Sequence, residues 1–283
     1  MSAQELRAHL NQRELALTGV PDHIDIERAD VGGVAGEWVR SRHIPPELKR
    51  TIIYLHGGYV YGSAAARRPL TWRLAEAGRC AVLALDFRLA PEHPFPAALD
   101  DCVSVYDALL AHGVSSTDIA IVGDSAGGGM AFGLLLRLQD ECKPLPRAVI
   151  GVSPFVDATF ASDSLTRNRH DDPVGEKAFS WIKTALAAYL GDAPAEHRYI
   201  SPLLQDLHGF PPACIVSSAH EVLADDSTRL AQRLRESDVE VALHMAAFMP
   251  HIFPLYADQL PEARNAIQTM GRFLLRQWVT VRR

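Results

Sequence analysis

The chain has 283 residues, a length that one large α/β domain can fill while burying an ample core. Apolar residues make up 48% of it and charged residues 22%, which is typical of ordinary globular proteins. A formal net charge of −6 argues against nucleic acid and anionic membranes as partners, and no apolar run approaches the length of a membrane span.

Strand and helix patterns alternate along the chain. Residues 3–17 alternate charges with leucines at near-helical spacing, and residues 23–29 and 34–40 predict an antiparallel pair of strands. Further strands are expected near residues 51–55, 81–85, 119–122, 148–152, 213–216 and 239–245. Helical patterns lie near residues 67–76, 97–111, 128–139, 176–190, 226–236 and 261–279. This alternation predicts a mostly parallel sheet with helices on both faces and ligands bound beyond the carboxyl ends of its strands.

A glycine-rich turn follows the first of these later strands. The buried-strand pattern over residues 51–55 ends in His56-Gly57-Gly58. Enzymes that transfer acyl groups use such a turn to supply backbone N–H groups, because the carbonyl oxygen becomes an anion in the tetrahedral intermediate. Removing one such donor typically lowers turnover by roughly two to three orders of magnitude.

The pentapeptide Gly123-Asp124-Ser125-Ala126-Gly127 is the most informative motif. A short apolar run precedes it and a long, mostly apolar helical pattern follows it. A G-x-S-x-G motif between a strand and a helix is typical of a nucleophile elbow. The serine backbone is strained there, and its hydroxyl stands at a helix N-terminus, where free N–H groups favour negative charge. Taken alone, the motif is also compatible with an ordinary helix start after a loop.

Two more candidate residues follow later predicted strands. Glu221 and His251 come after the apolar runs that end near residues 216 and 245. The order serine, acid, histidine is that of the α/β-hydrolases and differs from the chymotrypsin and subtilisin orders. Asp225 and Asp226 are rivals for the acid; the alternative is that they are first-turn helix charges, which are favourable near a helix N-terminus.

Four segments together give the chain a family resemblance. They are residues 56–63, residues 86–97 with the sequence DFRLAPEHPFPA, residues 123–127, and Pro250-His251. In these segments the chain resembles the bacterial hormone-sensitive-lipase-type α/β-hydrolases, in their carboxylesterase and lactone-hydrolase branch. The likeness extends from about Ile52 to the C-terminus. It implies an α/β-hydrolase fold, a catalytic triad of Ser125, Glu221 and His251, and oxyanion donors at the amides of Gly57, Gly58 and Ala126.

The chain departs from the family pattern at two places. Family members usually carry three small residues after the first histidine, whereas Tyr59 here follows only Gly57-Gly58. The donors are therefore either Gly57 with Gly58 or Gly58 with Tyr59, and we favour the first pair. Many relatives carry an aspartate followed four residues later by another, and here Glu221 stands four residues before Asp225. That spacing makes Glu221 the acid of the triad.

The segment from about residue 157 to residue 200 interrupts the alternation. Its first half is polar, and its second half is an amphipathic helical pattern with aromatic residues. By resemblance, this segment is the larger half of a cap over the acyl pocket and residues 1–20 are the smaller half, within a single domain of residues 1–283. The alternative is a surface helix packed on the sheet. We expect substrate contacts from Tyr59, Asp124, Phe155 and Trp181, although core packing explains the aromatic residues almost as well.

The four cysteines indicate the compartment. They are widely separated, and none has the paired spacing of a zinc site: Cys80, Cys102, Cys142 and Cys214. The N-terminus lacks a positive region followed by an apolar core, so we expect no signal peptide. Both observations favour a cytoplasmic protein with free thiols.

These features predict a serine hydrolase that cleaves carboxylic esters of short to medium acyl chain through an acyl-enzyme intermediate. The chemistry requires no metal or organic cofactor. The expected partner is a small-molecule ester, with no nucleic acid and no membrane, and the C-terminal sheet edge suggests a possible homodimer. Three alternatives stay open: a lactonase or amidase with the same triad, a small-ligand-binding protein of this fold that has lost catalysis, and a peptidase.

Overall fold

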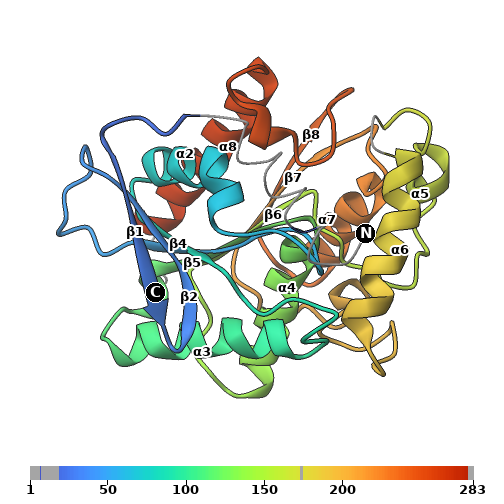
Figure 1. The fold of residues 1–283 in the computed structure, drawn as a ribbon, viewed down its shortest axis with the longest axis horizontal. Coiled ribbons are helices and arrows are strands. Elements are labelled where there is room, and N and C mark those ends of the chain that lie inside the picture. Colours follow the sequence, from blue (N-terminus) through green and yellow to red (C-terminus); the bar gives the residue numbers. More distant parts are fainter. Residues whose placement is uncertain (1–6, 8–18, 173–174, 280–283) are drawn as a thin grey trace.

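The computed structural model describes residue 7, residues 19–172 and residues 175–279, with side chains for all of these except residues 175–181. At its centre lies an eight-stranded sheet in the order β1-β2-β4-β3-β5-β6-β7-β8 (Figure 1). Its strands are β1 (Ile24–Val31), β2 (Val34–Ser41), β3 (Thr51–Leu55), β4 (Ala81–Leu85), β5 (Ile119–Asp124), β6 (Ala148–Val152), β7 (Ala213–Ser218) and β8 (Val241–Ala246).

The first two strands run differently from the rest. β1 pairs with β2 and β2 with β4 in antiparallel fashion, whereas every pairing from β4 to β8 is parallel. Strands β3, β5, β6 and β7 are buried along their whole length, as expected for parallel strands covered on both faces. The predicted mostly parallel sheet with an antiparallel start is confirmed.

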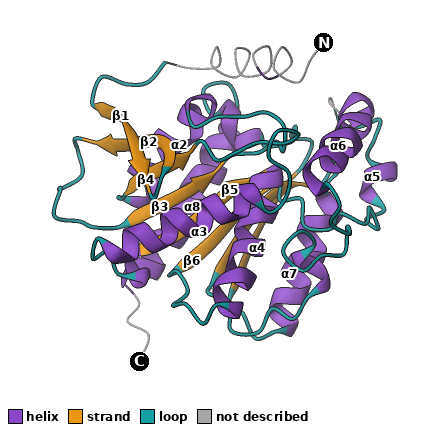
Figure 2. Cartoon of the chain, turned by 60° about the horizontal axis from the view of Figure 1, so that its bottom comes forward, coloured by secondary structure: helices purple, strands orange, loops and turns teal. Residues whose placement is uncertain are grey.

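Helices cover both faces of this sheet (Figure 2). The described helices are α2 (Arg68–Gly78), α3 (Ala97–Ala111), α4 (Ser125–Asp140), α5 (Ser164–Arg167), α6 (Gly175–Leu190), α7 (Ala224–Glu236) and α8 (Pro261–Val279). Each face has its own buried apolar cluster. One cluster contains Leu99 of α3, Leu134 of α4 and Leu230 of α7, and the other contains Leu74 of α2 and Leu274 of α8. None of these described helices combines the length and the apolar character needed to cross a bilayer.

The helix after β5 begins earlier than predicted. The expected start was near residue 128, but α4 begins at Ser125 itself, so the strand passes into the helix with no intervening loop. The helix predicted over residues 3–17 lies outside the described residues apart from Arg7. The Arg7 guanidinium donates to the carbonyl oxygens of Val60 and Ala90 and pairs with Glu92 at 2.9 Å.

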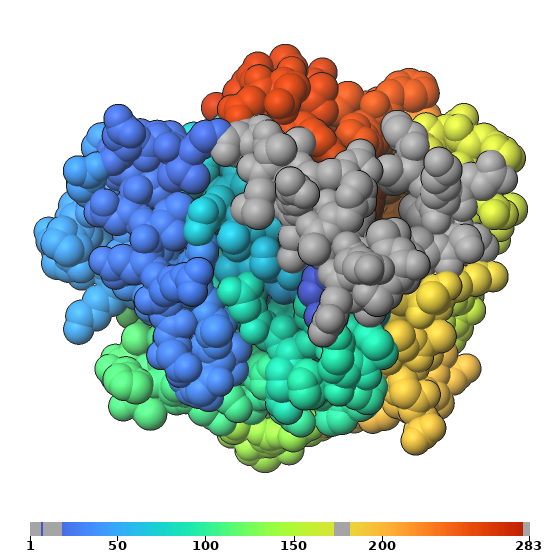
Figure 3. Space-filling model, viewed as in Figure 1, coloured from blue at the N-terminus to red at the C-terminus, as the bar shows by residue number. Residues whose placement is uncertain are grey.

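The described residues of the 157–200 segment lie on the flank opposite β1 and β2. In the space-filling view, the blue residues of the first two strands and the yellow to gold residues of this segment occupy the two sides of the molecule (Figure 3). Its helix α6 packs inward through Ala185, Leu186 and Tyr189, which are buried. The Tyr189 ring stacks on Tyr59 with 4.1 Å between centroids, so α6 contacts the turn that follows β3.

Candidate active site

Ser125 sits at the junction of β5 and α4 in a strained backbone conformation. Its φ is +52°, in the left-handed region that residues other than glycine rarely adopt. The two flanking glycines permit this tight turn. A Cβ at Gly123 would lie 2.2 Å from the carbonyl oxygen of Gly127, and one at Gly127 would lie 2.2 Å from that of Leu55. The G-x-S-x-G motif therefore has a steric cause, because any larger residue would push strand and helix apart.

A hydrogen-bonded relay connects this serine to a histidine and a buried carboxylate. His251 Nε2 lies 3.0 Å from Ser125 Oγ, and His251 Nδ1 lies 3.0 Å from Glu221 Oε2. Glu221 follows β7 and is fully buried, and His251 lies in the loop after β8. Since a carboxylate only accepts, the Nδ1 proton points to Glu221 and leaves the Nε2 lone pair for the serine hydroxyl. The structure thus brings together the three residues predicted for the triad.

The electrostatics of the relay favour proton uptake by His251. Burial alone lowers the pKa of His251, but the hydrogen bond to Glu221 and the negative charge of that residue outweigh it and raise the pKa above 6.5. A buried imidazole with a raised pKa is a stronger base toward the serine proton. The geometry and the charge therefore both suit general-base chemistry at Ser125.

A small cavity opens beside the Ser125 hydroxyl. It has a volume of about 40 Å³, and its walls are mostly apolar. Tyr59 and Phe155, two of the predicted substrate contacts, line it, as do Gly58 and Ala126. Trp181 lies on α6, but its side chain is outside the described part of the structure. The cavity therefore lies next to the nucleophile Ser125 and to two of the predicted oxyanion donors, Gly58 and Ala126.

The two possible registers of the oxyanion turn share Gly58. This residue has a φ of +88°, and it lines the cavity together with Tyr59. Gly57 is packed instead against the elbow, where an added Cβ would lie 2.5 Å from Asp124 Oδ2. The neighbouring His56 fixes the turn, because its Nδ1 hydrogen bonds to the Gly57 carbonyl oxygen at 2.9 Å. Burial lowers the pKa of His56 to about 4, so this imidazole is neutral and donates from Nδ1.

Comparison with known proteins identifies the family. Residues 52–255 match a family model described as the alpha/beta hydrolase fold. The chain is 34% identical to an esterase of Acinetobacter venetianus over 254 residues, covering 88% of this chain and 82% of that protein. It is 37% identical to an acetyl-hydrolase of Streptomyces hygroscopicus over 245 residues, covering 86% and 80%. A solved esterase of the bacterial hormone-sensitive-lipase family superimposes with a TM-score of 0.92 at 37% identity, over 98% of this chain and 92% of that chain.

This chain belongs to the α/β-hydrolases of the bacterial hormone-sensitive-lipase type. Both the predicted fold class and the resemblance are confirmed. A further solved esterase/lipase from an uncultured bacterium gives the same TM-score of 0.92 at 36% identity, over 99% of this chain and 92% of that chain.

Asp124 does not contact the cavity of this α/β-hydrolase, and the prediction that it binds substrate is wrong. Its side chain is fully buried and does not line the cavity. Arg67 pairs with it at 3.1 Å, and the Tyr54 hydroxyl donates to it at 2.6 Å. Arg67 is also fully buried and immediately precedes α2, so the ion pair joins the start of α2 to the elbow. Asp124 therefore anchors the elbow to Arg67 and Tyr54 and does not face the cavity.

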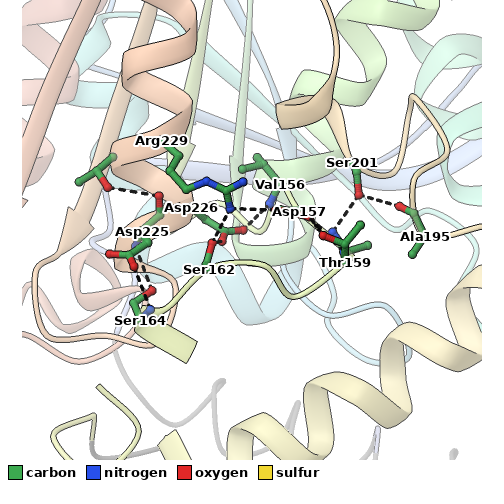
Figure 4. A network of polar contacts seen from close by, with 12 residues as sticks. Val156, Asp157, Thr159, Ser162, Ser164, Ala195, Ser201, Asp225, Asp226 and Arg229 are labelled. Carbon is green, nitrogen blue, oxygen red and sulfur yellow. Dashed lines mark hydrogen bonds and ion pairs between the residues drawn. The ribbon is translucent and has the colours of Figure 1, made fainter. Parts of the chain in front are cut away.

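Asp225 and Asp226 lie in the first turn of α7, as their alternative interpretation predicted. Neither is hydrogen-bonded to His251; both hold the polar half of the 157–200 segment, as Figure 4 shows. Asp225 accepts from the Ser164 amide at 2.9 Å. Asp226 accepts from the Val156 amide at 2.9 Å and from the Ser162 hydroxyl. Burial raises the pKa of Asp226 to about 7.

Sequence reasoning missed two serines that hold the acid of this α/β-hydrolase. Ser153 Oγ donates to Glu221 Oε2 at 2.9 Å, and Ser217 Oγ donates to Oε1. Ser153 also accepts from the Ile252 amide at 3.2 Å, so its hydroxyl links the acid to the loop that carries His251. Its φ of +46° marks a second strained serine at a strand end. In the sequence, only the position of Ser153 directly after the strand predicted over residues 148–152 could have indicated this role.

Proposed function

We propose that this α/β-hydrolase is a serine carboxylesterase with Ser125 as nucleophile, His251 as general base and Glu221 as the acid that orients it. The observation that carries the proposal is the relay of hydrogen bonds from Ser125 Oγ through His251 to Glu221, with 3.0 Å at each step. Relatives named as an esterase and an acetyl-hydrolase support it. A solved structure that is 36% identical was soaked with p-nitrophenyl butyrate, an ester.

Acylation uses each part of the site in turn. His251 Nε2 takes the Ser125 proton while Oγ attacks the ester carbonyl carbon. The negative oxygen of the tetrahedral intermediate accepts hydrogen bonds from backbone amides, for which we propose Gly57, Gly58 and Ala126. Collapse of the intermediate breaks the bond to the alcohol oxygen, which leaves with the proton from His251.

Deacylation repeats these steps with water as the nucleophile. His251 removes a proton from water as its oxygen attacks the acyl carbon, and Ser125 Oγ regains that proton as it leaves. The carboxylic acid is then released. Glu221 accepts from His251 Nδ1 and stabilises the imidazolium that forms in both halves of the reaction.

The cavity favours the short end of the predicted range of acyl chains. Its volume of about 40 Å³ is well below the roughly 150 Å³ of an engineered cavity that binds benzene. Tyr59 and Phe155 wall the cavity, and Ile182 and Ala185 bring α6 over it. An acetyl or butyryl group fits such a space better than an octanoyl group. We therefore propose that the acyl group of the substrate is short.

Hydrolysis of p-nitrophenyl acetate, butyrate, octanoate and palmitate by the wild type and by Ser125→Ala tests this function. We expect the wild type to cleave the acetate and butyrate fastest, and the variant to lose roughly 10⁶-fold in kcat. Equal turnover by both proteins would remove Ser125 from the mechanism. Absence of turnover in the wild type with every ester would overturn the esterase proposal.

The acid can be assigned by comparing two truncations. Glu221→Ala removes the carboxylate that accepts from His251 Nδ1 and should lower kcat by roughly 10⁴-fold, whereas Asp225→Ala should be mild. Asp225 is a matched control because it lies four residues away and bonds to Ser164 and Arg167. The opposite ranking would assign the acid to Asp225.

We also propose a homodimer and a cytoplasmic location. β8 forms one edge of the described sheet, and an unpaired strand edge can pair with a second copy. Light scattering gives the mass that tests this. The four free cysteines, of which Cys80, Cys102 and Cys214 are buried, suit a reducing compartment. Cell fractionation with an antibody against the protein tests the location.

A further inference from the structure

Two histidines and a glutamate converge at a surface that the esterase mechanism does not use. His23 precedes β1, His43 follows β2, and Glu76 lies in the last turn of α2. His23 Nε2 lies 2.8 Å from Glu76 Oε1, and His43 Nδ1 lies 3.5 Å from the same oxygen. The two imidazole rings stack with 4.2 Å between their centroids. Side chains from three separate segments thus direct one potential ligand atom each at a common point.

The backbone holds these side chains in place. The Arg42 amide donates to the His23 carbonyl oxygen at 2.9 Å, so the backbone of His23 is joined to the residue before His43 at the end where β1 and β2 pair. Ser41 Oγ donates to Glu76 Oε1 at 3.1 Å and connects the glutamate to the same strand end. The side chains themselves are partly exposed, from 33% for His23 and Glu76 to 67% for His43. They can therefore adjust to a ligand without moving the fold.

We propose that His23, His43 and Glu76 form a binding site for a divalent transition-metal ion, of which zinc is the probe. Zinc binds imidazole nitrogen and carboxylate oxygen at about 2.0–2.2 Å, so neighbouring ligand atoms of a tetrahedral site lie about 3.3 Å apart. The two separations to Glu76 bracket that value, and all three ligand atoms lie within 4.8 Å of one another. Two nitrogens with one oxygen suit zinc, nickel, cobalt or copper better than calcium or magnesium.

The ion would act on stability and not on ester cleavage. β2 runs antiparallel to β4, and Val39 pairs with Val82 near the start of β4. Ser41 and His43 therefore lie beyond the amino end of β4. Ser125 follows the carboxyl end of β5, which is the opposite end of the sheet. A bound ion would join the start of β1, the end of β2 and the last turn of α2. Because these three segments separate on unfolding, the ion stabilises the native state by mass action.

Zinc binding by untagged protein, stripped with a chelator, tests this site. Calorimetric titration with zinc chloride at about pH 7.5, above the ordinary pKa of imidazole, measures the binding. We expect wild-type binding to weaken at least tenfold in His43→Ala and in Glu76→Gln, and the zinc-dependent rise in Tm to disappear in both. His208→Ala is the matched control, because His208 pairs with Asp206 in an exposed cluster that contains only one histidine.

Several results would overturn the site. If wild type binds no zinc, the three residues form only a hydrogen-bonded surface cluster. If His43→Ala and Glu76→Gln bind zinc as wild type does, the ion lies elsewhere, for example at His251 and Glu221. Zinc-free His43→Ala should hydrolyse p-nitrophenyl acetate at the wild-type rate. The binding result therefore stands or falls independently of the proposed esterase function.

Discussion

Truncation of Ser153 should lower turnover while leaving substrate binding almost unchanged. In Ser153→Ala, Glu221 Oε2 loses the donor at 2.9 Å, and the Ile252 amide loses its acceptor at 3.2 Å. Hydrogen bonds to a charged group contribute about 1.5–3 kcal/mol. Glu221 keeps Ser217 and His251 as donors, so we expect the lower part of that range. About 1.4 kcal/mol corresponds to a tenfold fall in kcat.

A second substitution separates the loss of the hydroxyl from a general loss of stability. The φ of Ser153 is +46°, a conformation that costs a residue with a Cβ roughly 1–2 kcal/mol more than glycine. Ser153→Gly removes the same hydroxyl as Ser153→Ala but relieves this strain. We expect both variants to lose roughly tenfold in kcat, with KM little changed, while Ser153→Gly unfolds at a higher denaturant concentration than Ser153→Ala.

Steady-state kinetics with p-nitrophenyl acetate and equilibrium unfolding measure the two effects. Cys142→Gly is the matched control, because Cys142 is exposed, has a φ of +52° and makes no contact with the triad described above. It should gain stability with unchanged kcat. The reasoning is refuted if Ser153→Ala retains wild-type kcat. It is also refuted if kcat recovers in Ser153→Gly along with stability, because the hydroxyl would then have no role of its own.

Three further predictions concern charge. The acid limb of the kcat/KM profile should lie above pH 6.5, because His251 must be neutral to act as a base and its pKa is raised. In Glu221→Gln that limb should move to lower pH, since the imidazolium loses its negative partner; an unmoved limb would assign it to another group. Asp226 has a raised folded-state pKa of about 7, so between about pH 4 and pH 7 its contribution to stability should fall as pH rises, by up to about 1.4 kcal/mol per pH unit. Denaturation at several pH values should show the wild type losing stability relative to Asp226→Asn over that window, and parallel curves would contradict this. Arg67→Ala leaves the buried Asp124 carboxylate without its cation and should cost about 3–5 kcal/mol of unfolding free energy, whereas Arg67→Ala with Asp124→Asn should cost less; equal losses would show that the buried charge is not the cause.

Local motifs were enough to predict the parts of the site that depend on backbone shape. The elbow could be recognised because Gly123 and Gly127 are required wherever strand and helix approach so closely. The strand ends could be predicted because short apolar runs followed by polar residues mark where parallel strands leave the core. Since ligands bind at those ends, Ser125, Glu221 and His251 were expected to meet, and the structure brings them together.

Side-chain partnerships across long stretches of sequence could not be predicted in the same way. Asp124 is adjacent to the nucleophile, and adjacency suggested contact with substrate. It turns instead toward Arg67, which is 57 residues away. Ser153 lies 68 residues from Glu221 and carries no motif. The Ser153–Glu221 pair depends on β6 and β7 being neighbours in the sheet, and the Asp124–Arg67 pair depends on the start of α2 lying beside the end of β5. The sequence pattern alone does not specify either arrangement.

The loop that carries the acid is held by residues that lie just before α6. Asn168 Nδ2 donates to the carbonyl oxygens of Ala219 at 3.0 Å and Glu221 at 2.9 Å, and the Val222 amide donates to Asp172 at 3.1 Å. Backbone on both sides of the acid is therefore anchored to residues 168–172, just before α6. Because α6 follows these residues in the chain and lines the acyl cavity through Ile182 and Ala185, one segment contacts both the loop of the acid and the pocket. We therefore expect substitutions at Ile182 or Ala185 to change acyl-chain preference and turnover together.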